Sequence, residues 1–168
     1  KVSNKYHRAA PKGIGNAKAI GNYSASLLPL IEAKNSGFDE VIYLNAKDEE
    51  FVEEVGSANL FVLTGNTIKT PKLDGSILPG ITRDSITILA KDTIGLEVLE
   101  TNVTLTELYD ADEVFCTGTM CGLAPVSYVD GRQINPNNPQ YPGNITSKLQ
   151  GEYVKLTQDE SYGVKIVV

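Results

Sequence analysis

The sequence is poor in the residues that many catalytic and metal sites use, with one histidine, two cysteines, one methionine and no tryptophan among 168 residues. A single histidine, His7, excludes a histidine-based metal cluster and a histidine-activated nucleophile, so we expect no metal site. No serine lies in a Gly-x-Ser-x-Gly motif, which disfavours hydrolase chemistry. No apolar run approaches the roughly 20 residues of a membrane helix, so no membrane partner is expected.

The two cysteines, Cys116 and Cys121, lie five positions apart, a spacing that fits neither a disulfide framework nor a zinc-ligand pattern. This favours a reducing compartment, and we expect the protein to be cytoplasmic. The chain begins with Lys1 and its single methionine is Met120. We therefore expect that a segment upstream has been removed. Because a targeting signal could belong to that segment, an organelle location stays open.

The net charge of −6 disfavours nucleic acid as a partner, because no basic stripe interleaved with aromatic residues offsets it. A chain of 168 residues, 41% of them hydrophobic, buries about 70% of its extended surface around one core. We therefore expect a single domain over residues 1–168.

Hydrophobic residues alternate along the chain between helical and strand spacing. The helical pattern predicts helices at 22–35, 81–91, 104–111 and 145–156, the third opened by a capping box from Thr104 to Glu107. The strand pattern predicts strands at 41–44, 51–55, 59–64, 67–70, 96–100, 113–117 and 125–129. Gly65-Asn66 indicates a hairpin, so the fold class is predicted to be α/β with a mixed sheet.

Lys18 stands in a run of small residues, Gly-Asn-Ala-Lys-Ala-Ile-Gly-Asn-Tyr over 15–23, just before the first predicted helix. Such a setting can hold the amine against a carbonyl cofactor as a Schiff base. A solvated surface lysine is the alternative that the residues alone leave open.

Two short segments could each bind an anion. Residues 78–83, Leu-Pro-Gly-Ile-Thr-Arg, precede a predicted helix, whose first amide N–H groups and dipole favour a phosphate. Residues 117–119, Thr-Gly-Thr, follow a strand with a buried pattern. Simple helix entry and an ordinary strand-end turn are the respective alternatives.

Glu53 and Glu54 are adjacent in a predicted strand, so their side chains point to opposite faces and one of them is expected to point inward. An inward carboxylate keeps its charge beside a cation or a donor, and a protonated pyridine nitrogen is such a partner. The spacing does not choose between the two, and exposure of both on an edge strand is the alternative.

In chain order these pieces form four motifs: Ala-Lys-Ala-Ile-Gly-Asn-Tyr, Glu-Val-Gly-Ser-Ala-Asn-Leu-Phe, Leu-Pro-Gly-Ile-Thr-Arg-Asp and Gly-Thr-Met-Cys-Gly-Leu-Ala-Pro-Val. Together they resemble the branched-chain amino acid aminotransferases, which belong to the fold-type IV pyridoxal phosphate enzymes. The resemblance runs from Tyr6 to the last predicted helix. It implies a barrel-like, mixed-sheet large domain that binds pyridoxal 5′-phosphate.

The resemblance also implies a role for each motif residue. Lys18 would be the Schiff-base lysine and would move the proton during catalysis, which requires that the site lower its pKa from about 10.4 through desolvation and cationic neighbours. The other implied contacts are Tyr23 to the phenolic oxygen of the cofactor, Glu54 to the pyridine nitrogen, Leu78 to the ring face, Ile81, Thr82, Gly118 and Thr119 to the phosphate, and Thr119 and Met120 to the substrate carboxylate.

The implied reaction is transamination of leucine, isoleucine and valine with 2-oxoglutarate, which gives branched 2-oxo acids and glutamate. The family forms homodimers and has an N-terminal small domain with most of the side-chain pocket; no counterpart of that domain is found in this sequence, so we expect the chain to be inactive by itself. Some members carry Cys-x-x-Cys after the phosphate-binding Gly-Thr, but Cys121 and Ala124 occupy those positions here. A D-amino acid aminotransferase, an aminodeoxychorismate lyase and a non-catalytic domain of the same fold are the alternatives.

Overall fold

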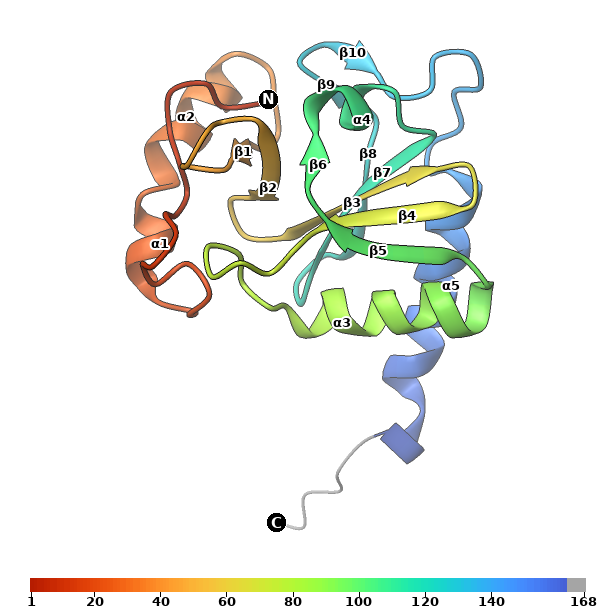
Figure 1. Ribbon diagram of the computed structural model, residues 1–168. Coiled ribbons are helices and arrows are strands. Elements are labelled where there is room, and N and C mark those ends of the chain that lie inside the picture. The colour runs from red at the N-terminus through yellow and green to blue at the C-terminus, as the bar shows by residue number, and fades with distance from the viewer. Residues whose placement is uncertain (163–168) are drawn as a thin grey trace.

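The computed structural model describes residues 1–162, in which helices surround a large mixed sheet (Figure 1). The helices are α1 (Ile20–Ser24), α2 (Leu27–Asn35), α3 (Ile81–Ile88), the π-helical segment η1 (Leu89–Ile94), α4 (Leu105–Tyr109), α5 (Asn144–Gln158) and the 3-10 turn η2 (Glu160–Tyr162). The strands are β1 (Ile42–Leu44), β2 (Phe51–Val55), β3 (Asn59–Thr64), β4 (Thr67–Pro71), β5 (Glu97–Thr101), β6 (Val103–Thr104), β7 (Glu113–Gly118), β8 (Gly122–Val126), β9 (Tyr128–Val129) and β10 (Arg132–Gln133).

The first eight strands form one sheet with the path β1-β2-β3-β4-β5, to which β6 is added through β2, and β7 and β8 through β3. The pair β4 and β5 is parallel, whereas the other pairs of this sheet are antiparallel. The prediction of a mixed α/β fold is therefore confirmed. The barrel-like shape is not, because no ring of paired strands closes within residues 1–162 and β6 meets β2 over only two residue pairs.

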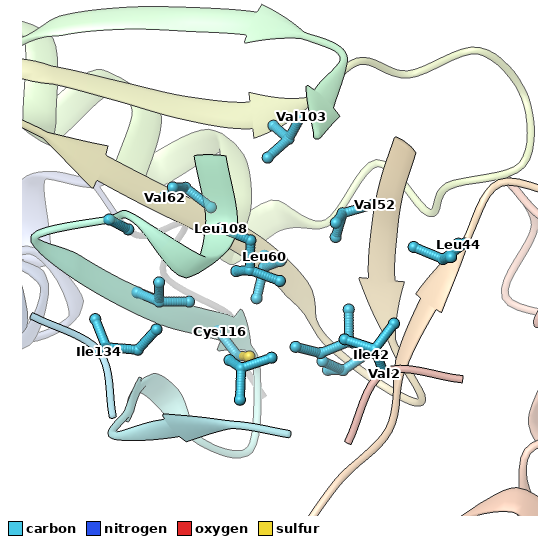
Figure 2. Packing of buried hydrophobic residues seen from close by; sticks show 14 residues of the cluster. Val2, Ile42, Leu44, Val52, Leu60, Val62, Val103, Leu108, Cys116 and Ile134 are labelled. Atoms are coloured by element: carbon cyan, nitrogen blue, oxygen red, sulfur yellow. The ribbon is translucent and has the colours of Figure 1, made fainter. Parts of the chain in front are cut away.

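Both faces of the sheet are covered, so β3 is buried on both sides. Along this strand, side chains point alternately to the two faces. Leu60 and Val62 join the hydrophobic cluster that Figure 2 shows, together with Leu108 of α4. Phe61 stacks on Phe115 of β7 with ring centroids 5.1 Å apart, on the face that α3 and α5 cover. With both faces filled, the ends of the strands are where a cavity can open.

The predicted helix over 22–35 is broken into α1 and α2, and Pro29 explains the break. In one continuous helix the ring of Pro29 would clash with the carbonyl group of Ala25, and its missing N–H would leave that carbonyl unpaired. In the observed structure Pro29 is the third residue of α2, where no intrahelical partner is needed. The separate helix α1 begins two residues after Lys18 and carries Tyr23.

Most other elements lie where the sequence predicts them. The capping box of α4 is complete, because Thr104 accepts a hydrogen bond from the Glu107 amide while the Glu107 carboxylate accepts one from the Thr104 amide. The predicted hairpin joins β3 and β4, with Thr64 opposite Thr67. Among the helices of residues 1–162, none combines the length and apolar character needed to cross a bilayer.

Candidate active site

A cavity of about 720 Å³ opens at the ends of β2, β3 and β7, a size in the usual range for small-molecule sites. Its walls come from four separate parts of the chain: the loop before α1, the β2–β3 turn, the segment leading into α3 and the β7–β8 turn. All nine predicted site residues line it, namely Lys18, Tyr23, Glu54, Leu78, Ile81, Thr82, Gly118, Thr119 and Met120. The fold thus brings the four motifs together, while the role of each residue stays a prediction.

Glu54 is the buried acidic group of this cavity, with only 2% of its surface exposed. One guanidinium nitrogen of Arg8, Nη1, lies 2.6 Å from its Oε1, and the Arg8 side chain is 1% exposed. The Leu78 amide donates to the same oxygen at 3.3 Å, and Asn59 Nδ2 lies 3.5 Å from Oε2. The carboxyl group is therefore held from three directions, with its orientation fixed before any ligand arrives.

Burial raises the pKa of Glu54 to about 8, while the positive charge of Arg8 acts in the opposite direction. The carboxyl group therefore gains or loses its proton in the physiological pH range. A second cation placed beside Glu54 would favour the charged carboxylate, because an opposite charge a few ångströms away lowers the pKa of an acid. The site is thus suited to bind a protonated ring nitrogen.

Arg8 was not singled out from the sequence, although it connects two of the predicted residues. Its guanidinium carbon lies 5.7 Å from the centre of the Tyr23 ring, and its Nε donates to the Gly56 carbonyl at 3.3 Å. Arg8 thereby fixes Glu54 and Tyr23 relative to each other. The available sequence signal is slight: an arginine in the short run Arg-Ala-Ala-Pro just before the glycine-rich segment.

The loop that carries Lys18 is fixed by close packing and by hydrogen bonds. Gly15 is buried, and a Cβ at this position would overlap the Ser76 carbonyl. Asn22 Nδ2 donates to the carbonyls of Ile14 at 2.8 Å and Ala17 at 3.0 Å. Lys18 itself is exposed at the cavity.

Both adjacent carboxylates of β2 are buried, so the alternative in which both are exposed on an edge strand is wrong. Glu53 points away from the cavity, and Ser76 Oγ lies 2.5 Å from its Oε1 and 2.7 Å from Asp74 Oδ1. Burial raises the pKa of Glu53. The segment 72–80 thus covers the second face of β2, a tertiary effect that strand alternation cannot reveal.

The start of α3 and the β7–β8 turn form a part of the cavity wall that can hold an anion and that we call the anion corner. Thr82 lies in the first turn of α3 and is 3% exposed, next to the free amide groups of the helix N-terminus. Thr119 follows at the β7–β8 turn, beside Gly118. Thr117 Oγ1 of the same cavity wall is buried without a hydrogen-bond partner in the described chain. An unpaired buried hydroxyl in a cavity wall fits a polar ligand.

Asn59 fixes the entry to α3, because its Nδ2 donates to the Leu78 carbonyl at 2.8 Å and its Oδ1 occupies the space where a Cβ of Gly80 would lie. We expect Gly80→Ala to displace this segment, to lower the free energy of unfolding by about 1–3 kcal/mol and to weaken cofactor binding at least about 10-fold. Chemical denaturation and cofactor titration measure the two effects.

The matched control for this substitution is Gly151→Ala in α5, where an added Cβ meets nothing within 4 Å. Alanine is the better helix former, so this variant should gain about 0.5–1 kcal/mol and bind the cofactor as the wild type does. Equal cofactor affinity in Gly80→Ala and Gly151→Ala would contradict the role assigned to the Asn59 contact.

The fold, the buried acid, the amine and the anion corner are the combination expected of a pyridoxal phosphate enzyme, the class that the four motifs resemble. The chain belongs to the amino-transferase class IV family, whose model matches residues 2–129.

Similar proteins include a probable branched-chain-amino-acid aminotransferase of Staphylococcus epidermidis, 42% identical, which covers 99% of this chain and 49% of the relative. The chloroplastic branched-chain-amino-acid aminotransferase 3 of Arabidopsis thaliana is 48% identical over 93% of this chain and 37% of its own length. The crystal structure of the branched-chain amino acid aminotransferase of Thermobaculum terrenum in its PLP form has a TM-score of 0.85 at 32% identity, covering 96% of this chain and 52% of that one. The chain thus spans about half the length of the staphylococcal relative.

Proposed function

We propose that this chain is the cofactor-binding part of a pyridoxal-phosphate-dependent aminotransferase that acts on leucine, isoleucine and valine with 2-oxoglutarate. The observation that carries the proposal is that nine motif residues, predicted from four separate segments, line one cavity. A surface lysine or an edge-strand glutamate would have no reason to meet the other motifs there. The names of the relatives support the substrate class.

The cavity fits pyridoxal 5′-phosphate by its size and by its lining, which combines a buried acid with groups that can hold an anion. Glu54 would face the ring nitrogen, Tyr23 the phenolic oxygen and Leu78 one face of the ring. Ile81, Thr82, Gly118 and Thr119, which belong to a helix N-terminus and a strand-end turn, would hold the phosphate. When bound, this cofactor supplies an electron sink for the substrate carbon that loses its proton.

The side chains of the protein then orient the cofactor and the substrate and transfer protons. The Lys18 amine would hold the cofactor covalently through its carbonyl group and, once free, would accept and return the substrate proton. Glu54 keeps the proton on the ring nitrogen, and Arg8 holds Glu54 in place. Thr119 and Met120 are exposed and line the cavity, and their backbone amides would bind the substrate carboxylate.

The whole protein would contain further parts. We propose that residues 1–168 form its large domain, with a small N-terminal domain supplying most of the substrate side-chain pocket, and that the protein is a homodimer. Coverage of only 49% of the staphylococcal relative supports a further domain. We propose the cytoplasm as its compartment; similar plant enzymes are named chloroplastic or mitochondrial.

Amino-donor assays on the full gene product test the function. With 2-oxoglutarate as acceptor, glutamate should form when leucine, isoleucine or valine is the amino donor, but not when D-alanine is. Aminodeoxychorismate should not be cleaved. Turnover of D-alanine or cleavage of aminodeoxychorismate would replace the branched-chain assignment with another enzyme of the same fold. Cofactor binding without any turnover would indicate a non-catalytic domain.

A further inference from the structure

We propose that Tyr153 of α5 positions Thr82 for the cofactor phosphate and thereby makes the C-terminal helix part of the cofactor site. The inference rests on the proposed function and names a residue outside the four motifs. Tyr153 does not line the cavity, but its hydroxyl lies 3.3 Å from Thr82 Oγ1.

Tyr153 lies next to both segments that form the anion corner. The first contact is the hydroxyl pair with Thr82 in the first turn of α3. Gly122, whose φ is +58°, faces the tyrosine ring, since a Cβ added at Gly122 would lie 3.8 Å from Tyr153 Cε1. Gly122 begins β8, directly after the turn that carries Gly118 and Thr119. One tyrosine therefore lies beside two segments that are far apart in the sequence.

The helix that carries Tyr153 is firmly attached to the sheet. At its start, the Glu113 carboxylate of β7 accepts hydrogen bonds from the amides of Ile145 at 2.9 Å and Thr146 at 2.7 Å. One turn before Tyr153, Gln150 Nε2 donates to the Leu123 carbonyl at 3.0 Å. The position of the tyrosine hydroxyl is thus set by β7 and β8, the strands that flank the anion corner.

The hydrogen bond between the Tyr153 and Thr82 hydroxyls also determines the direction in which the Thr82 hydroxyl can donate. Thr82 is 3% exposed, so solvent does not compete for its hydroxyl, and Tyr153 is its hydrogen-bond partner within residues 1–162. A hydroxyl can accept one hydrogen bond while it donates another. When Tyr153 donates to Thr82 Oγ1, the Thr82 proton is free to point at a phosphate oxygen. The phosphate oxygens accept hydrogen bonds and do not donate them, so phosphate binding favours the arrangement in which Tyr153 donates to Thr82 and Thr82 donates to the phosphate.

Comparison of pyridoxal phosphate with pyridoxal, which lacks the phosphate, tests the inference in the full gene product. We expect Tyr153→Phe to weaken binding of pyridoxal phosphate about 3- to 10-fold, the effect of one neutral hydrogen bond, and to leave pyridoxal binding unchanged. Thr82→Val should show the same selectivity. The double variant should be no weaker than Thr82→Val alone, because the tyrosine acts through the threonine.

The matched control is Tyr109→Phe, which removes a tyrosine hydroxyl that donates to Asp130 at 2.9 Å, outside the cavity. This variant should bind both cofactor forms as the wild type does. Equal weakening of both forms by Tyr153→Phe, additive effects in the double variant or no change at all would each overturn the inference. Failure of the wild-type protein to bind pyridoxal phosphate would overturn the proposed function as well, so the two failures are distinguishable.

Discussion

Substitution of Lys18 by alanine should abolish the visible absorbance of the lysine-linked cofactor and lower transamination by at least about 10³-fold. The amine has two functions in the proposed reaction, covalent attachment and proton transfer, and alanine provides neither. Reduction of the cofactor-loaded wild-type protein with borohydride should fix the cofactor on the peptide that contains Lys18. The variant should carry no such label.

The control for Lys18→Ala is Lys34→Ala, which removes an exposed lysine of α2 that does not line the cavity. It should retain both the absorbance band and the activity. A band that survives in Lys18→Ala, or a reduced cofactor found on another lysine, would disprove the assignment of the amine.

Glu54→Gln is expected to separate catalysis from stability. The amide cannot keep the ring nitrogen protonated, and loss of one preorganised electrostatic partner lowers kcat by about 10²–10³-fold in other enzymes. The amide nevertheless has the shape of a protonated carboxyl group, the form that burial favours in the cofactor-free protein. Steady-state kinetics and denaturation of the same preparations provide both measurements.

The pH dependence of stability gives a second test of Glu54. Its pKa is raised from an ordinary value of 4.5 to about 8, so between these values the folded protein holds a proton that the unfolded chain has lost. The contribution of this group is therefore complete below pH 4.5 and is lost as the pH rises toward 8. Relative to Glu54→Gln, the free energy of unfolding of the cofactor-free wild type should fall across this window.

The neighbouring substitution Glu53→Gln is the control for the activity measurement. Glu53 lies one position earlier in β2, is equally buried and faces Ser76 away from the cavity. Glutamine can still accept the serine hydrogen bond, so the activity should stay close to that of the wild type. A comparable loss of activity in both variants would mean that Glu54 matters for the packing of β2 and not for the ring nitrogen.

The sequence predicts those parts of the structure that depend on neighbours along the chain. The capping box at Thr104 and the hairpin turn at Gly65 are local, and both are found as expected. Burial on both faces of β2 is different, because the segment 72–80 that covers Glu53 folds back from beyond the next two strands. The role of Arg8 is not predictable from the sequence for the same reason, since its partner Glu54 is 46 positions away and only the fold joins them.

Assembly of the cavity from four distant stretches of chain has a consequence for the protein in the cell. The unfolded chain has no such cavity, so a cofactor that binds there stabilises only the native state, by about 2.7 kcal/mol at a free concentration 100 times the dissociation constant. The supply of the cofactor would then affect the lifetime of the protein as well as its catalytic rate. When the cofactor is scarce, the cellular amount of a variant that binds it weakly would fall before that of the wild type.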